Sequence, residues 1–151
     1  MSLETLIREV LAEHISLSNE WQDIQNIVKD VIIEEPKMKE EKYRFLKPLT
    51  DLFGRSHIFM SKFKLHEIKE ERFIFPEMSE RGKESIVFRL LDDHRKLDGL
   101  LEDMRTLLED YRFEKISAKE LVERMLKIHK EATGIILEHI GIEDAEFPKL
   151  E

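Results

Sequence analysis

The sequence predicts an all-α protein, an up-down-up-down antiparallel four-helix bundle. Apolar residues recur in alternating steps of three and four through four segments, the first and third segments share one pattern, and capping or proline signals bound the others. The length of 151 residues suits one domain with one core. We therefore expect a single domain over residues 1–151, formed by two pseudo-repeats at about 3–76 and 83–148.

The first and third predicted helices each carry one histidine inside an apolar seam. The first covers residues 3–33 with His14 in the seam, and the third covers residues 83–111 with His94. Adding 80 to each seam position from 7 to 31 gives the positions of the third helix. Each histidine is therefore predicted to point into the bundle. The two apolar seams are Leu3, Ile7, Val10, Leu17, Trp21, Ile24, Val28 and Val31, and Val87, Leu90, Leu97, Leu101, Met104, Leu108 and Tyr111.

The second and fourth predicted helices carry a histidine and a glutamate four residues apart. The fourth begins at the capping box from Ser117 to Glu120, and the proline at position 148 ends it. The second begins near residue 46 and ends at the proline at position 76, after a connection over residues 35–45. The inward stripes are Leu52, Phe59, Phe63, His66, Glu70 and Phe73, and Leu121, Met125, Ile128, Ala132, Ile135, His139, Ile142 and Glu143.

Helix lengths place these polar residues at one level of the bundle. His14 lies about 20 residues before the end of its helix and His66 about 20 residues after the start of the next, so both are about 30 Å from the same end. His94 and His139 are closer in sequence than His14 and His66, because the connection between the first two helices is longer. They therefore also fit one level of the bundle. The predicted polar layer contains His14, His66, Glu70, His94, His139 and Glu143.

A buried layer of this composition requires a partner. Each unsatisfied buried polar group costs roughly 1–3 kcal/mol, and an unpaired buried carboxylate costs more. No lysine or arginine stands on the inward stripes near this level, so a metal cation is the expected partner. Six ligands exceed the four of a tetrahedral zinc site and suit two ions that share two carboxylates. Mixed imidazole and carboxylate ligands favour iron, with manganese or zinc as alternatives.

Two motifs resemble those of a known family. HEIKEERFIFP (66–76) and HIGIEDAEFP (139–148), with His14 and His94 in that order along four helices, resemble the hemerythrin-like family, also called the HHE cation-binding domain. The resemblance covers nearly the whole chain and implies a four-helix bundle with an oxo- or hydroxo-bridged di-iron centre. It implies that His14 and His66 bind one iron and that His94 and His139 bind the other, with Glu70 and Glu143 bridging them.

The sequence departs from the oxygen-carrying members at two positions. Their further histidine, one turn after the third-helix histidine, is replaced by Asp98, which either supplies an oxygen ligand or leaves a position open to water. Their last motif ends in aspartate, so Asp144 competes with Glu143 as the second bridge; we prefer Glu143 because it matches Glu70 in the internal repeat. Glu67 directly follows His66 and lies about 100° round the helix from it, so we read it either as a solvated residue or as an additional ligand, because some relatives use an acid there.

Other residues are assigned to the surface or the core. His57 lies half a helical revolution from His66, so we expect it to be exposed, and His129 falls on the flank of its stripe. Trp21, Phe59 and Phe63 are expected in the core, where they also wall the metal pocket.

Composition narrows the function. A net charge of -8 argues against nucleic acid, no apolar run approaches a membrane span, and the absence of cysteine excludes thiol chemistry. We expect a cytoplasmic non-heme di-iron protein that binds or senses oxygen or another small diatomic ligand such as NO, or iron. The alternatives are a di-iron enzyme acting on peroxide or nitric oxide, and a zinc-bound or metal-free structural interaction module. The sequence does not identify a protein partner.

Overall fold

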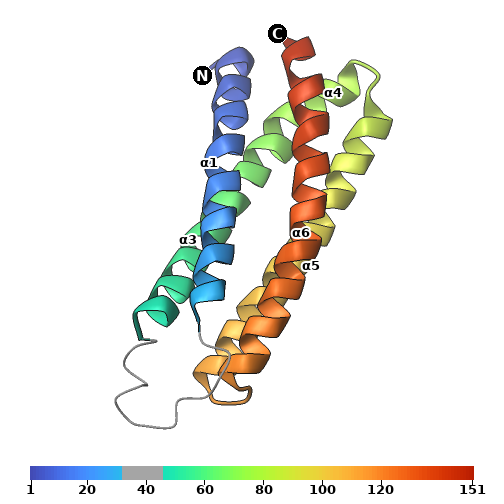
Figure 1. Cartoon of the computed structure of the whole chain (residues 1–151). Coiled ribbons are helices and arrows are strands. Elements are labelled where there is room, and N and C mark those ends of the chain that lie inside the picture. The colour runs from blue at the N-terminus through green and yellow to red at the C-terminus, as the bar shows by residue number, and fades with distance from the viewer. Residues whose placement is uncertain (32–45) are drawn as a thin grey trace.

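The computed structural model describes residues 1–31 and 46–151, which form an antiparallel four-helix bundle (Figure 1). Helix α1 packs on α3 and α6, and α5 packs on α6 and α3, while both termini lie at one end. The predicted fold class is confirmed, and the described ranges contain no strand. The predicted connection over residues 35–45 lies outside the described residues. The elements are α1 (Leu3–Asp30), α3 (Leu46–Lys69), the π-helical turn η1 (Glu70–Ile74), α4 (Phe75–Glu80), α5 (Glu84–Arg112), α6 (Ala118–Glu146) and the 3₁₀ turn η2 (Phe147–Leu150).

Local signals define the helix ends. The Ser2 side chain accepts a hydrogen bond from the Thr5 backbone N–H, and that of Ser117 accepts one from Glu120 N–H at 3.1 Å. The predicted start of α6 is thereby confirmed. Helix α4 ends at Glu80, and Gly82 follows its C-cap residue with a φ of +80°, in the left-handed region that glycine adopts without a steric penalty.

The core forms two apolar clusters on either side of the predicted polar layer. The larger cluster includes Leu17, Trp21 and Leu97, and the smaller one includes Val10 and Leu90. In α1 the polar layer stands between Val10 and Leu17, at the position of His14, and in α5 it stands between Leu90 and Leu97. Most predicted seam residues are buried, so periodicity identified the inward faces correctly.

One prediction failed at the end of the second helix. Phe73 is 59% exposed rather than inward, and Pro76 does not end the helix. The turn Glu70–Ile74 is π-helical, with the Phe75 N–H bonded to the Glu70 carbonyl, and this inserts one residue into the helical register. Ile74 and Phe75 are therefore buried in place of Phe73. Pro76 falls in the first turn of α4, where its missing N–H is tolerated.

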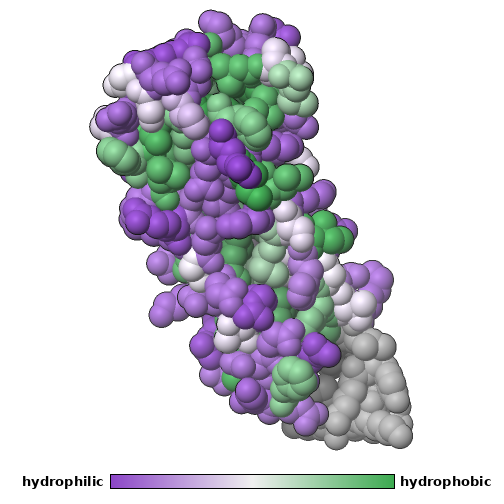
Figure 2. Space-filling view, turned by 180° about the vertical axis from the view of Figure 1, so that it is seen from behind, coloured by the Kyte–Doolittle hydropathy of each residue, from purple (hydrophilic) through white to green (hydrophobic). Residues whose placement is uncertain are grey.

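The outer surface is mixed in character. Figure 2 shows a face on which hydrophilic side chains predominate and hydrophobic ones form scattered groups. Within the described ranges, no helix combines the length and the hydrophobicity needed to cross a bilayer.

Candidate metal centre

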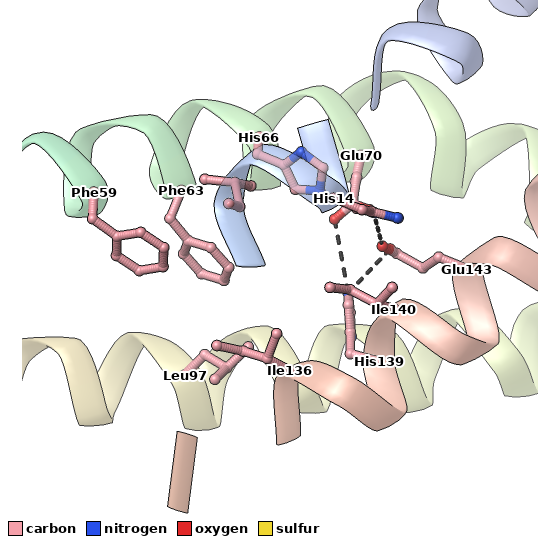
Figure 3. Close-up of a pocket in the computed structure, with 11 residues that line it drawn as sticks. His14, Phe59, Phe63, His66, Glu70, Leu97, Ile136, His139, Ile140 and Glu143 are labelled. Carbon is pink, nitrogen blue, oxygen red and sulfur yellow. Dashed lines mark ion pairs between the residues drawn. The ribbon is translucent and has the colours of Figure 1, made fainter. Parts of the chain in front are cut away.

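The six residues of the predicted polar layer meet in the bundle interior. α1 supplies His14, α3 supplies His66, the π-helical turn supplies Glu70 and α5 supplies His94. The pair on α6 is His139 and Glu143, at the spacing that puts both side chains on one helix face. All six side chains are buried, and both glutamates are fully shielded from solvent. Figure 3 shows five of them converging from different helices: His14, His66, Glu70, His139 and Glu143.

Glu70 lies between two pairs of histidines. Its Oε2 is 3.5 Å from His66 Nε2 and 4.0 Å from His14 Nε2. Its Oε1 is 3.0 Å from His94 Nε2 and 3.8 Å from His139 Nε2. The two carboxylate oxygens therefore face different histidine pairs.

Glu143 repeats this arrangement from the opposite side. Its Oε1 is 2.9 Å from His14 Nε2, and its Oε2 is 3.0 Å from His139 Nε2. The six residues consequently form two groups of potential ligand atoms, each with all atoms within 4.8 Å of one another, and the groups share both glutamates. The groups are His14, His66, Glu70 and Glu143, and Glu70, His94, His139 and Glu143.

Three histidines are oriented by a carboxylate on their outer side. In each case Nε2 faces the centre and Nδ1–H donates to an acidic side chain, a contact that fixes both the ring orientation and the tautomer. Glu13 in turn pairs with Lys69, and Asp93 lies 3.5 Å from the Arg89 guanidinium. The three contacts are His14 to Asp144 at 2.9 Å, His66 to Glu13 at 2.8 Å and His139 to Asp93 at 3.1 Å.

The centre leaves buried polar atoms without hydrogen bonds. His14 Nε2, Glu70 Oε2 and both carboxylate oxygens of Glu143 are shielded from solvent and make no hydrogen bond within the described part of the chain. Close distances such as that from His14 Nε2 to Glu143 Oε1 do not have hydrogen-bond geometry. Among residues 1–31 and 46–151, no lysine or arginine pairs with Glu70 or Glu143. Cations coordinated by these atoms would satisfy them, so the residues present fit a metal centre.

A small cavity adjoins the centre. Its volume is about 20 Å³, which holds roughly one water-sized molecule. His14, His66, Glu70, His139 and Glu143 line its polar side, as Figure 3 shows. Its apolar wall consists of Leu17, Phe59, Phe63, Leu97, Ile136 and Ile140. Phe59 and Phe63 line the cavity as predicted, whereas Trp21, also predicted as a pocket wall, is buried in the core and does not line this cavity.

A family model described as the hemerythrin HHE cation binding domain matches residues 5–150, nearly the whole chain. The chain belongs to this family. The resemblance that the two motifs indicated is thereby confirmed, and cation binding at the buried histidine–glutamate cluster is the function that the family description supports. No match was found among curated proteins or among solved structures.

The two glutamates of the HHE domain affect each other's pKa in the absence of metal. Burial raises the pKa of both, but contacts from Glu143 and the surrounding histidines outweigh burial at Glu70 and hold its pKa well below the ordinary value. The charge on Glu70 adds to burial at Glu143 and raises its pKa. The two carboxyl groups therefore have pKa values shifted in opposite directions.

Adjacent carboxylates raise the pKa of three histidines of the centre. Burial lowers the pKa of His66 and His139, but these carboxylates dominate and raise the pKa of His66 to about 9 and that of His139 to about 11. Contacts with Glu143 and Asp144 likewise raise the pKa of His14. Metal ions must displace protons from these rings, so binding releases protons.

Glu67 of the HHE domain is not solvated, contrary to one of the readings from sequence. It is 1% exposed, and its Oε2 lies 3.5 Å from His94 Nδ1, on the side of that ring away from the shared glutamates. Burial and the neighbouring Asp98 raise the pKa of Glu67 to about 9. Asp98 lies beside Glu67 and pairs with Lys64, outside both four-residue groups.

The remaining sequence expectations had different outcomes. His57 is exposed as predicted, and its Nδ1–H donates to the Phe53 carbonyl. His129 was predicted on the flank, but it is buried, donates to the Trp21 carbonyl at 2.9 Å and stacks on that indole. Asp144 contacts the outer nitrogen of His14 rather than the centre, which is consistent with the preference for Glu143. The roles of Glu13 and Asp93 were missed, because an acid on a helix flank is indistinguishable in sequence from a solvated one.

Proposed function

We propose that this HHE domain holds two iron ions and binds or senses oxygen, another small diatomic ligand such as NO, or iron itself. His14 and His66 would bind one ion, His94 and His139 the other, and Glu70 and Glu143 would lie between them. The proposal rests on the position of the two glutamates. In each, one carboxylate oxygen lies close to a histidine of one pair and the other oxygen lies close to a histidine of the other pair. A single ion would leave one pair without a ligand role.

The ligand types are suitable for iron. Four imidazoles and two carboxylates suit iron, while manganese and zinc accept similar ligands. Iron would supply reversible electron transfer and affinity for oxygen and nitric oxide. The protein supplies a rigid set of donors, held by Asp144, Glu13 and Asp93, and a core that excludes bulk water.

The cavity supports a small ligand. A volume of about 20 Å³ beside the centre matches a water-sized or diatomic molecule, and its wall offers no hydrogen-bonding side chain outside the centre itself. An organic substrate would require the helices to separate.

The test is anaerobic loading of the metal-free protein with ferrous iron, followed by metal quantification. We expect about two irons per chain and new ferric charge-transfer absorption when oxygen is admitted. Glu70→Gln and Glu143→Gln should each lower the bound iron, whereas Glu131→Gln, an exposed charge change on α6, should not. A protein that takes up no transition metal at any stage would refute the proposal.

The same preparation separates binding from catalysis. Rapid mixing of the reduced protein with oxygen, peroxide or nitric oxide should give one stable spectral change if the domain is a carrier or sensor. Repeated consumption of peroxide or nitric oxide would instead support the enzymatic alternative. Tight zinc binding without any response to these ligands would support a structural role.

A further inference from the structure

A second pocket lies between α3 and α5, next to the proposed centre. Its volume is about 300 Å³, and its charged lining is Lys64, Glu67, Asp98 and Glu102. Phe63 lines both this pocket and the central cavity, so its ring separates the two. The lining brings three carboxyl groups and one ammonium group together beside the buried metal-binding residues.

Glu67 is the buried wall of this outer pocket. Its side chain is 1% exposed, and neither carboxyl oxygen has hydrogen-bond geometry with any of the described residues. A buried carboxyl group without a partner is costly, and the burial of Glu67 is not explained by any lysine or arginine contact among the described residues. An unsatisfied buried acid that lines a carboxylate-rich pocket points to a cationic ligand.

Further oxygen and nitrogen donors surround Glu67. The potential ligand atoms of Glu67, Glu71 and His94 all lie within 4.8 Å of one another. His94 Nδ1 is 3.5 Å from Glu67 Oε2 and 3.7 Å from Glu71 Oε1. Asp98 lines the outer pocket together with Glu67, whereas Glu71, which is 37% exposed, lies beside His94 and does not line that pocket.

We propose that Glu67, Glu71 and Asp98 form an outer cation site, which captures a divalent first-row metal ion and passes it past His94 to the buried centre. This proposal rests on the two-ion centre proposed above. Carboxylate oxygens bind such ions without the geometric constraint of the inner cluster, which suits a site that must release its ion.

His94 is the residue suited to the transfer. Its Nε2 lies 3.0 Å from Glu70 Oε1 in the centre, and its Nδ1 faces Glu67 and Glu71. That Nδ1 makes no hydrogen bond, whereas the Nδ1 of His14, His66 and His139 each bonds a carboxylate. One imidazole therefore borders both sites and is held less firmly on its outer side than the other three.

Lys64 competes with a cation in the outer site. Its ammonium nitrogen lies 3.5 Å from Asp98 Oδ2, and the side chain is 61% exposed, so it can move away. Removing this ammonium should speed up metal capture, while removing a carboxylate should slow it. The two kinds of substitution are thus predicted to change the rate of metal uptake in opposite directions.

The test measures the rate of metal uptake by the full chain, with cobalt(II) absorption as the probe and metal analysis at the end point. Glu67→Gln and Asp98→Asn should slow uptake by about 10-fold, and Lys64→Met should accelerate it by roughly 2–5-fold, since charge in a cleft acts on association rate. All three should still reach the wild-type stoichiometry. Asp103→Asn, an exposed charge change on α5, is the matched control and should load at the wild-type rate.

The outcomes separate this proposal from the proposed function. Wild-type uptake of two ions with unchanged rates in Glu67→Gln and Asp98→Asn would overturn the outer site and leave the centre intact. Loss of one ion in Glu67→Gln would make Glu67 a ligand of the centre and also overturn it. Failure of the wild type to load two ions would overturn both proposals. If Glu67→Gln does not fold, the surface variants Asp98→Asn and Lys64→Met still test the outer site, because the first should slow metal uptake and the second should accelerate it.

Discussion

Single residues of the centre hold protons where a metal would bind. The pKa values of His66 and His139 lie near 9 and 11, above the ordinary histidine value of about 6.5. Both rings are therefore charged in the metal-free protein at neutral pH, and they are neutral in the unfolded chain above about pH 6.5. The charge that stabilises the empty centre is the same charge that opposes metal binding.

The metal-free protein should lose stability as the pH rises. The contribution of His66 and His139 is fully present below about pH 6.5 and is lost as the pH passes through about 9 and then about 11. Chemical denaturation with a chelator present, between pH 6.5 and pH 10, measures this. A free energy of unfolding that rises over this range would contradict the assignment.

The carboxylates behind the histidines should tune metal affinity. Glu13→Gln weakens the acceptor that holds His66, so we expect metal affinity to fall by about 10- to 100-fold. Competition with a chelator of known affinity measures this change. Glu9→Gln removes a nearby exposed charge that also contacts Lys69 but not His66, and it should leave affinity almost unchanged.

At the level of elements, the π-helical turn reconciles the two histidine–glutamate motifs. Phe75 follows Glu70 by five positions, whereas Phe147 follows Glu143 by only four. The π turn accommodates the additional residue, so Phe75 and Phe147 are both buried, with ring centroids 6.4 Å apart. Phe75 also lies 5.5 Å from the His94 ring. The turn preserves the pseudo-repeat in space where it is imperfect in sequence.

Deletion of Phe73 should therefore be tolerated. Removing this exposed residue would let the π turn become α-helical and would give both motifs one length, with an expected loss of about 1 kcal/mol or less. Deletion of Arg105, exposed within regular α5, should instead rotate one part of its seam by about 100° and prevent stable folding. Thermal denaturation of both variants measures the difference, and equal destabilisation would contradict this account of the turn.

The elements also show what sequence could and could not predict. Regular steps of three and four identified four helices and their inward faces, and the histidines in those seams identified the level of the polar layer. Phe73 was misplaced because a π turn changes the register without a residue type that marks it. Glu67 and His129 were misplaced because neighbouring helices cover a flank that periodicity alone leaves exposed. Whether a residue on the flank of a helix is buried depends on how the helices pack together, and the sequence pattern of one helix does not reveal this packing.

For the molecule as a whole, the polar layer divides the core. Apolar clusters lie on both sides of the six residues, and α1, η1, α5 and α6 each contribute to both clusters or to the layer between them. Unbonded atoms such as His14 Nε2 and Glu143 Oε1 leave this middle section the least satisfied part of the interior. Metal ions there would connect all the helices that carry the layer.

Metal loading should consequently stabilise the entire bundle. A free ion concentration of 100 times Kd adds about 2.7 kcal/mol, provided that the unfolded chain does not bind the ion. Thermal denaturation with ferrous iron under anaerobic conditions, compared with chelator, should show a higher Tm in the loaded protein. Combining Glu70→Gln with Glu143→Gln should abolish the increment, and an equal increment in that variant would place the stabilising ions elsewhere.

The size of the central cavity has a kinetic consequence. A space of about 20 Å³ behind Phe59 and Phe63 admits a molecule larger than water only when side chains around it move. Ligand exchange would then proceed at the frequency of these side-chain motions, and it would slow in viscous solution and under pressure. Small ligands would then exchange faster than larger ones, because they need smaller side-chain displacements to enter.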